Sequence, residues 1–259
     1  MLKTLFLKII LTLVNLLRNN ETIMKYFITL ILAFALNIQT SAQTNKYFDA
    51  PFGGGGGFVG GWSMPNVDPI NLKLKEIGIP ELSTSGVFTT GGAGFIYIGV
   101  IKNLRVGGMG YGGSTSSSST VNGINNEAIY SLGGGGLTVE YTLPFIKNIG
   151  VSVGAILGGG SMSLELYSND GNFSWEDILE NQSNISRRIE NSFWIFTPTL
   201  IADFPVYRFI SLRAGLGYQF TFAGDWEAEN GQPVSGIPSD LSADGFFIQV
   251  GIFAGFFSF

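Results

Sequence analysis

The chain has no histidine and no cysteine among its 259 residues, and charged side chains make up only 13% of it. Ser-His-Asp triads and Asp-His dyads need histidine as their base, so these hydrolytic arrangements are excluded. The lack of cysteine removes disulfides, thiolate nucleophiles, thiolate metal sites and a lipid-anchored cysteine. The charged share is about half of that in ordinary soluble domains, which argues against a soluble enzyme.

Long apolar runs are also missing from most of the chain. Beyond residue 45, no run reaches the roughly 18 apolar residues that mark a membrane-spanning helix. Membrane strands escape this test, because only alternate residues of such a strand are apolar. Glycine, in contrast, is abundant at 37 residues, about twice its usual share, and 45% of the chain is apolar.

The N-terminal region has the pattern of a secretory leader. Residues 24–42 have a short basic start, an apolar core and small residues at the end, so we expect a signal peptide cleaved after Ala42. Residues 1–23 form a second basic and apolar stretch. We interpret them as an upstream extension, with Met24 as the true start; an uncleaved anchor is the alternative.

The expected mature domain, residues 43–259, is acidic. It keeps 10 basic and 18 acidic side chains, a net charge of −8. This balance argues against nucleic acid or anionic lipid headgroups as partners.

Eight segments are predicted to be strands, and their connections alternate between long and short. The expected strands are residues 52–62, 87–100, 104–113, 128–142, 149–167, 191–204, 208–222 and 244–259. The long connections include a helical turn or two at residues 70–78, a flexible serine-rich segment at 114–126 and a short capped helix after Ser174. The alternation predicts an all-β, eight-stranded antiparallel up-and-down barrel, with short turns inside the cell and four long loops outside.

Alternating side chains support a membrane barrel. In the strand at 244–259, one parity is apolar and the other mixes aromatic, glycine and amide residues; the apolar set is Phe246, Ile248, Val250, Ile252, Ala254 and Phe256. Even-numbered residues of 212–222 are also apolar, which places them against lipid. In the strand at 149–167 the apolar parity changes across residues 158–160, which predicts a β-bulge there.

Charged residues within the predicted strands should point into the lumen, because a charge facing lipid costs roughly 2–4 kcal/mol at mid-membrane. The candidate lumen charges are Arg105, Glu140, Asp203 and Arg213, with Glu165 as a further candidate. Eight strands leave an interior wide enough only for side chains, so a packed lumen is expected. A polar path for a small solute is the alternative.

Other candidate sites are weaker. The glycine runs lack the lysine and the strand–loop–helix context of a phosphate-binding loop, and we attribute them to curvature and close packing. An acidic loop cluster could form a weak Ca²⁺ site or a solvated surface; it comprises Asp170, Asn172, Glu176, Asp177 and Glu180. No cofactor is expected. Aromatic residues near strand ends predict interfacial girdles; these are Trp62, Tyr97, Tyr130, Tyr141, Tyr167, Trp194, Phe204, Tyr218, Phe222 and Trp226.

The closing segment, with Phe257 and Phe259 at its end, resembles the last strand of bacterial outer-membrane β-barrels. Topology, parity and the terminal aromatic together resemble the small barrels of the OmpA/OmpX/OmpW kind. The resemblance implies a Gram-negative outer-membrane location, lipid contacts and recognition of the terminal aromatic by the barrel assembly machinery. Barrel enzymes of that membrane depend on histidine, so no enzyme is expected.

We therefore expect a structural or interaction role, carried by the four long extracellular loops and an unknown extracellular ligand. Two alternatives stay open at this point. One is a narrow, porin-like channel for small solutes. The other is a soluble secreted lipocalin-like binding protein or β-sandwich.

Overall fold

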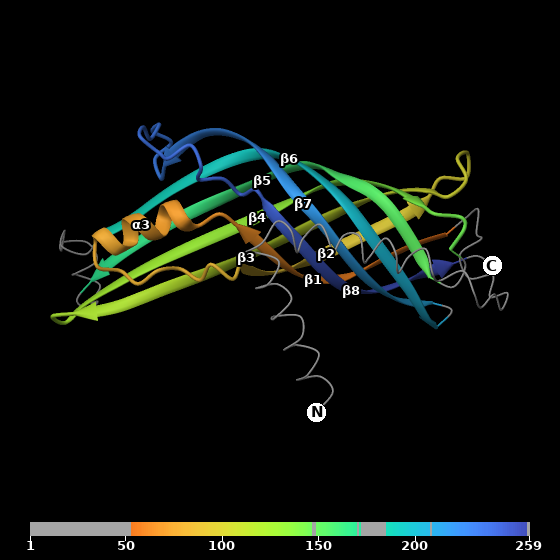
Figure 1. Cartoon of the computed structure of the whole chain (residues 1–259), viewed down its shortest axis with the longest axis horizontal. Helices are drawn as coiled ribbons and strands as arrows, with labels where there is room; N and C mark the ends of the chain where they lie inside the picture. Colours follow the sequence, from red (N-terminus) through yellow and green to blue (C-terminus); the bar gives the residue numbers. More distant parts are fainter. Residues whose placement is uncertain (1–52, 147–148, 170, 172–184, 208, 258–259) are drawn as a thin grey trace, which may run out of the picture. The chain divides into compact units, whose positions relative to one another are not determined.

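The computed structural model describes residues 53–146, 149–169, 171, 185–207 and 209–257, and these form one ring of eight strands with a helix (Figure 1). The elements are β1 (Gly53–Pro65), α3 (Asp68–Glu76), β2 (Val87–Tyr97), β3 (Leu104–Val121), β4 (Ile124–Thr142), β5 (Gly150–Asn169), β6 (Ile185–Tyr207), β7 (Ile210–Ala228) and β8 (Gly245–Phe257). The expected signal peptide and upstream extension lie outside the described residues.

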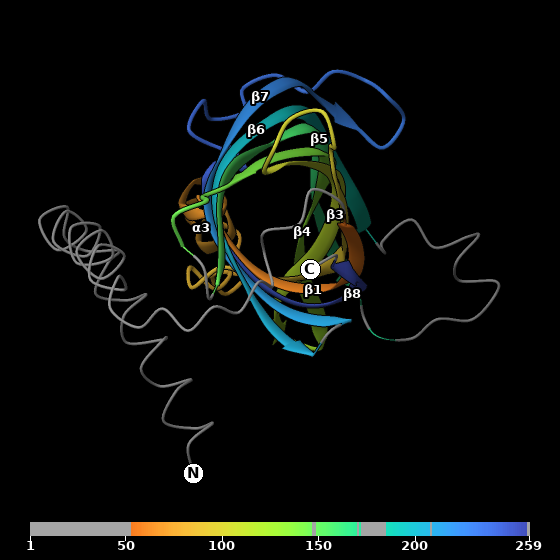
Figure 2. The same ribbon diagram turned by 90° about the vertical axis from the view of Figure 1, so that its right-hand side faces the viewer.

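The ring is closed by the first and last strands. Each strand pairs antiparallel with the next in sequence, and β1 pairs with β8 from Gly53–Phe257 to Pro65–Gly245. Figure 2 shows the resulting barrel from one end. Closure leaves no strand edge unpaired around the ring, which is the condition for sheet in a hydrocarbon environment. The predicted all-β, eight-stranded up-and-down fold is confirmed.

The strands on one side of the barrel are longer than the sequence indicated. The serine-rich segment 114–126, expected to be a flexible connection, is instead the tip of the β3–β4 hairpin, paired from Leu104–Tyr141 to Val121–Ile124. Asn122 and Gly123 have φ angles of 52° and 79°, the left-handed values of a two-residue hairpin turn. The flexible-loop prediction was wrong because serine and threonine are compatible with a pleated strand once a turn fixes the register.

The expected strand faces are confirmed. The apolar parity of β8 is exposed, while Phe247, Gln249 and Phe253 on the other parity are buried. The even-numbered residues of β7, such as Leu212 and Leu216, are likewise exposed. The sequence left the faces of β1 to β3 open. In these strands Phe58, Phe88 and Ile96 are exposed, whereas large apolar side chains also point inward, namely Val59, Phe95, Met109 and Tyr111.

The expected bulge in β5 is absent. Pairing between β4 and β5 runs unbroken through Gly136–Gly158 and Gly134–Gly160. The apolar residues change parity because the surroundings change: Leu157 faces outward, whereas Met162 and the following even-numbered leucines face an apolar interior. A register shift occurs instead between β6 and β7 near Asn191, and it turns Trp226 inward.

Many glycines allow neighbouring strands to approach closely. A Cβ at Gly158 would overlap the backbone of Gly135 and Gly136, whereas a Cβ at Gly110 would meet nothing within 4 Å. The glycine runs therefore serve close strand packing at some positions and leave the surface bare at others.

We expect Gly158→Ala to destabilise the barrel by about 1–3 kcal/mol, because the methyl group would push the β4 and β5 backbones apart. Gly110→Ala is the matched control and should change stability by less than about 0.5 kcal/mol. Urea unfolding in lipid vesicles, followed by tryptophan fluorescence, measures both variants. Equal effects of the two substitutions would contradict the packing role.

Candidate functional site

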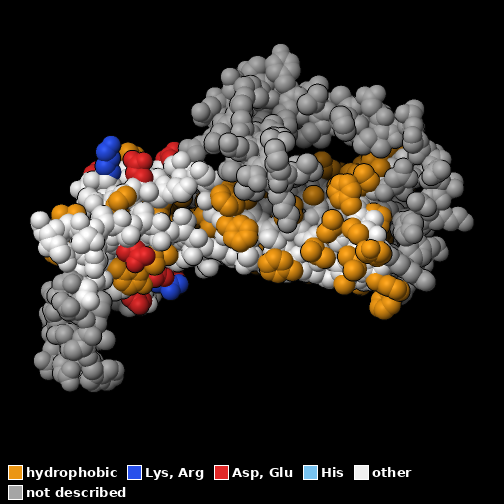
Figure 3. Space-filling model, turned by 90° about the horizontal axis from the view of Figure 1, so that it is seen from below, with side chains coloured by type: hydrophobic (Ala, Val, Ile, Leu, Met, Phe, Trp, Pro, Cys, Tyr) orange, Lys and Arg blue, Asp and Glu red, His pale blue; other side chains and the backbone are white. Residues whose placement is uncertain are grey.

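The outer surface carries a belt of exposed apolar side chains. Trp194 is 74% exposed, and the large exposed side chains of the strands include Phe58, Phe88, Leu137, Leu157, Phe204, Leu216, Phe222, Val250 and Phe256. In Figure 3 the hydrophobic side chains gather toward one end of the barrel, while the charged side chains lie toward the other. Phe204 and Trp194 are ten residues apart on β6. At about 3.4 Å per residue and a strand tilt of about 40°, this separation spans roughly 25 Å along the barrel axis, which is the thickness of the lipid-facing band of a membrane barrel.

An apolar groove of about 620 Å³ lies within the belt. Gly94 and Gly107 contribute to its lining, with Ile96, Val106 and Leu137 beside them. The missing side chains of the glycines make this part of the wall thinner than the aromatic-covered side formed by β6 to β8. Among the described residues, Thr138 is the one polar side chain in the lining of the groove, and the rest of the lining is apolar, which is consistent with contact to hydrocarbon.

The four predicted lumen charges meet in one cluster inside the belt. Arg105 donates from Nε to Glu140 and from Nη1 to Asp203 Oδ2 at 2.6 Å. Arg213 Nε donates to Asp203 Oδ1 at 2.7 Å, and its Nη1 lies 3.6 Å from Glu140 Oε1. All four side chains are at most 4% exposed. Two guanidinium groups and two carboxylates balance, so the lumen carries no net charge at this level.

Aromatic rings pack against the two arginines of this charge cluster. The guanidinium carbons of Arg105 and Arg213 lie 4.6 and 4.5 Å from the centre of the Phe95 ring, and that of Arg213 lies 4.4 Å from the Phe253 ring. Contacts of this kind are worth on the order of 2 kcal/mol when they are desolvated. Toward the short turns, Thr142 bonds Ser152 at 3.0 Å. The charges are therefore held by packing as well as by pairing.

The lumen stays filled beyond the charge cluster. Tyr111 donates to Gln219, and its ring lies 5.1 Å from that of Phe247. Some buried polar atoms have no hydrogen-bond partner among the described groups: Thr89 Oγ1, Arg105 Nη2, Asn191 Oδ1, Thr197 Oγ1, Thr199 Oγ1 and Gln249 Oε1. Such atoms are normally satisfied by ordered water, so we expect internal waters among them.

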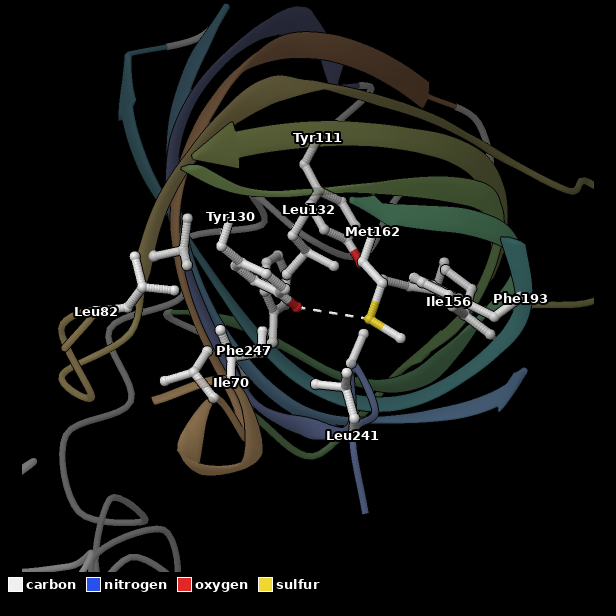
Figure 4. Packing of buried hydrophobic residues seen from close by; sticks show 14 of the residues in the cluster. Ile70, Leu82, Tyr111, Tyr130, Leu132, Ile156, Met162, Phe193, Leu241 and Phe247 are labelled. Carbon is white, nitrogen blue, oxygen red and sulfur yellow. Dashed lines mark hydrogen bonds between the residues drawn. The ribbon is translucent and has the colours of Figure 1, made fainter. Parts of the chain in front are cut away.

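The end of the barrel opposite the short turns has an apolar interior, which we call the cap. It is formed by the outer ends of β3 to β6, helix α3 and the segment before β8; Figure 4 shows its side chains, among them Ile70, Leu82, Tyr130, Met162 and Leu241. The Tyr130 hydroxyl points to the Met162 sulfur at 3.7 Å. Here the apolar side chains face inward, the reverse of the lipid-facing belt.

Helix α3 is held in the cap by its buried apolar face and by hydrogen bonds between the Asn71 side chain and the backbone of the following segment. Ile70 and Leu74 are buried. The expected helix is present, but it ends at Glu76, two residues before the expected end at Gly78, whose φ of 76° turns the chain out of the helix. Asn71 fixes the following segment, because its side chain donates to the Leu82 carbonyl at 3.0 Å and accepts from the Leu82 amide at 2.7 Å. The first long connection thus packs its apolar side chains against the interior of the cap, and we call it the lid.

Some sequence expectations need correction. Glu165 is not a lumen charge: it lies on the outer face of β5 beyond the belt, 3.5 Å from Arg188. Tyr130 and Trp226 are buried in the cap rather than in a girdle. Phe257 ends β8 beside Gly53, while its side chain and Phe259 lie outside the described residues. So does the proposed Ca²⁺ cluster.

Within the described part of the chain, no group of three or more acidic side chains is placed to hold a metal ion.

Among the same residues, no helix has both the length and the apolar character needed to cross a bilayer.

The closed ladder, the apolar belt and the paired interior charges meet the requirements of a barrel in a bilayer. The chain is a membrane-spanning β-barrel. Its exposed belt contradicts the soluble lipocalin-like alternative, because a soluble protein does not expose a continuous apolar surface around its circumference. The closed ring contradicts the β-sandwich.

Several solved structures match most of this chain at low sequence identity. A major outer membrane protein of Thermus thermophilus matches 78% of this chain and 99% of its own at 11% identity and a TM-score of 0.42. The attachment invasion locus protein Ail of Yersinia pestis, in complex with the heparin analogue sucrose octasulfate, matches 79% and 99% at 11% identity and a TM-score of 0.40. CarO2 of Acinetobacter baumannii matches 78% and 98% at 11% identity and a TM-score of 0.33. No protein-family model and no curated protein matches the chain.

We expect Asp203→Asn to destabilise the barrel by about 3–5 kcal/mol, because both arginines would lose a buried carboxylate partner. Glu76→Gln is the control: it removes the exposed Lys73–Glu76 pair of 2.8 Å and should cost less than about 1 kcal/mol. Urea unfolding in vesicles at neutral pH compares them. A small effect of Asp203→Asn would mean that the cluster contributes little to stability.

Proposed function

We propose that this protein is a non-conducting outer-membrane protein that presents its cap to a partner outside the cell. The observation that carries the proposal is the cap itself. β3 to β6 continue beyond the belt and enclose, together with α3, an apolar core of their own. A barrel that only needed to span the membrane would not require this additional folded layer.

The interior supports this role over the narrow channel. A solute would meet the cap core at one end and the Arg105–Glu140–Asp203–Arg213 cluster at the other. Separating buried ion pairs of this kind costs several kcal/mol, too much for a path that is open at rest. The channel alternative would need movement of both the lid and the cluster.

A catalytic role is not part of the proposal. The sequence offers neither histidine nor cysteine to serve as base or nucleophile, and we infer no reaction from the remaining side chains. Outer-membrane lipid is the proposed surrounding of the belt. Insertion by the barrel assembly machinery stays a prediction of the sequence.

Charge indicates what kind of partner the cap favours. Among the described residues beyond the belt there are eleven acidic and four basic side chains, a net charge of −7. Exposed carboxylates include Glu227 near the end of β7, and Glu229 and Asp240 on the connection between β7 and β8. Ail was crystallised with a polysulfated heparin analogue. For this chain we infer the opposite preference, a partner surface that is neutral or positively charged.

We expect the purified protein to give no stepwise currents in planar bilayers, because the lumen is blocked at two levels. A variant with Arg105→Ala and Asp203→Ala, checked for its folded state by heat-modifiable gel mobility, tests whether the cap alone blocks the lumen. We expect this variant to stay silent as well. Steady stepwise currents from the wild-type protein would favour the channel.

We expect bacteria that display the protein to be retained on polylysine-coated surfaces and not on heparin-coated ones. The triple variant Glu227→Gln, Glu229→Gln, Asp240→Asn should reduce retention, with Lys102→Gln at a short turn as the control. Cell counts after washing at low and high salt provide the measurement. Retention on heparin above that of non-displaying cells would contradict the proposed charge preference.

A further inference from the structure

The sheet that surrounds the cap has two edges, because it extends beyond the closed ring. β2 pairs with β3 no further than Thr90–Gly112, whereas β3 continues to Val121 in its pairing with β4. On the other side, β8 pairs with β7 no further than Gln219–Gly245. Beyond these points the sheet therefore has one edge on β3 and one on β7; the hairpin of β3 and β4 reaches the left end of the barrel in Figure 1.

The edge on β7 is closed by the chain itself. The Val234 amide donates to the Trp226 carbonyl at 2.7 Å, and the Ala228 amide donates to the Gln232 carbonyl at 2.8 Å. Glu227 adds an exposed charge to the same edge. A covering segment and charged side chains are two ordinary means by which proteins keep a strand edge from pairing with another chain.

Backbone hydrogen bonds show which residues of β3 face its edge. The Leu104 carbonyl accepts from the Ile98 amide on the β2 side, whereas the Asn103 carbonyl accepts from the Thr142 amide on the β4 side, both at 2.9 Å. Antiparallel pairing alternates in this way, so the N–H and C=O groups of even-numbered β3 residues point away from β4. Those that lie beyond β2, which we call the edge residues, are Ser116, Ser118 and Thr120.

The connection before β2 lies beside this edge without pairing with it. The hydroxyls of Ser117 and Ser119, on the inward parity, donate to the carbonyls of Pro80 and Gly78 at 2.6 and 3.3 Å. Among the described residues, no backbone hydrogen bond joins this connection to the edge residues. Residues 114–121 contain no charge and no proline, and their pairing with β4 has no bulge. The β3 edge thus lacks the protection that closes the β7 edge.

A second copy of this chain does not fit the open edge. Two copies in one membrane would be related by a two-fold axis along the membrane normal, so strands tilted by about 40° would cross at roughly 80°. Strands that share a ladder are much closer to alignment than this. Copies in two facing membranes would bring together two caps with a net charge of −7 each. The occupant is therefore a segment of a different protein.

We propose that the edge residues bind an extended peptide segment of an extracellular partner, which adds to β3 as a further strand. The N–H and C=O groups of all three edge residues are available to it. Glu127, which pairs with Ser118, and the exposed Glu81 lie close to the bound segment, so lysine or arginine side chains on it are favoured. This inference rests on the proposed partner role of the cap and adds the mode of binding.

The experiment uses a fluorescent peptide of about ten residues, alternating threonine and lysine, and the full-length protein in nanodiscs. Fluorescence anisotropy measures binding to the wild-type protein, to Ser116→Pro with Ser118→Pro, and to Ser116→Ala with Ser118→Ala. Proline removes two N–H groups that point out of the sheet and leaves the bonds to β4, which come from the alternate residues. Alanine removes the hydroxyls and keeps the N–H groups.

We expect the proline variant to bind the peptide about 10-fold or more weakly than the wild-type protein, and the alanine variant to stay within about 2-fold. The bound peptide should also slow hydrogen exchange of the wild-type amides in residues 114–121, because these amides then have a hydrogen-bond partner. Heat-modifiable gel mobility checks that each variant is folded.

Three results would overturn the proposal. One is the absence of binding to the wild-type protein up to about 1 mM peptide. Another is an equal loss of binding in the alanine and proline variants, which would assign recognition to the hydroxyls. The third is binding that the proline variant retains and that leaves hydrogen exchange unchanged. Charge alone would then hold the peptide, so the charge preference of the cap would stand while the edge site failed.

Discussion

Every backbone N–H and C=O group inside a bilayer needs a partner within the protein, and this structure depends on how that requirement is met. β1 and β8 are separated by nearly the whole described chain, yet their pairing closes the ring. Once the ring is closed, each strand has one face toward lipid and one toward a narrow interior. The positions of the apolar belt, the charge cluster and the glycines all follow from that division.

At the outer edge of the belt, the apolar side chains change from the outer face of the strands to the inner face. Within the belt, Leu157 and Trp194 face lipid while Arg213 and Asp203 pair inside. Beyond it, Met162 and its apolar neighbours turn inward and polar residues cover the outside. The outer surroundings of the same strands therefore change from hydrocarbon to an aqueous layer. The ladder of backbone hydrogen bonds continues across this change.

The interior is closed by two different means, and both bear on function. The charge cluster is neutral and buried, so it is stable only when all four partners are present. The cap is an apolar core of ordinary kind, completed by α3 and fixed by the two bonds between Asn71 and Leu82. A filled lumen leaves the outer surface of the barrel and of the cap to carry a function.

Much of the fold could be predicted from residue order alone. Alternation in the segments that became β7 and β8 has period two, which is a local property, and the cost of a charge in lipid is enough to place Arg105, Glu140, Asp203 and Arg213 inside. The length of the β3–β4 hairpin, the inversion at Met162 and the lid could not be predicted in this way. Each depends on neighbours that are distant in the chain. The apolar side chain of Met162 can face inward because Tyr130 and α3 enclose an apolar interior around it. Ser114 belongs to a strand because β4 pairs with it. Periodicity thus determined which residues share a face, while tertiary packing decided which solvent each face meets.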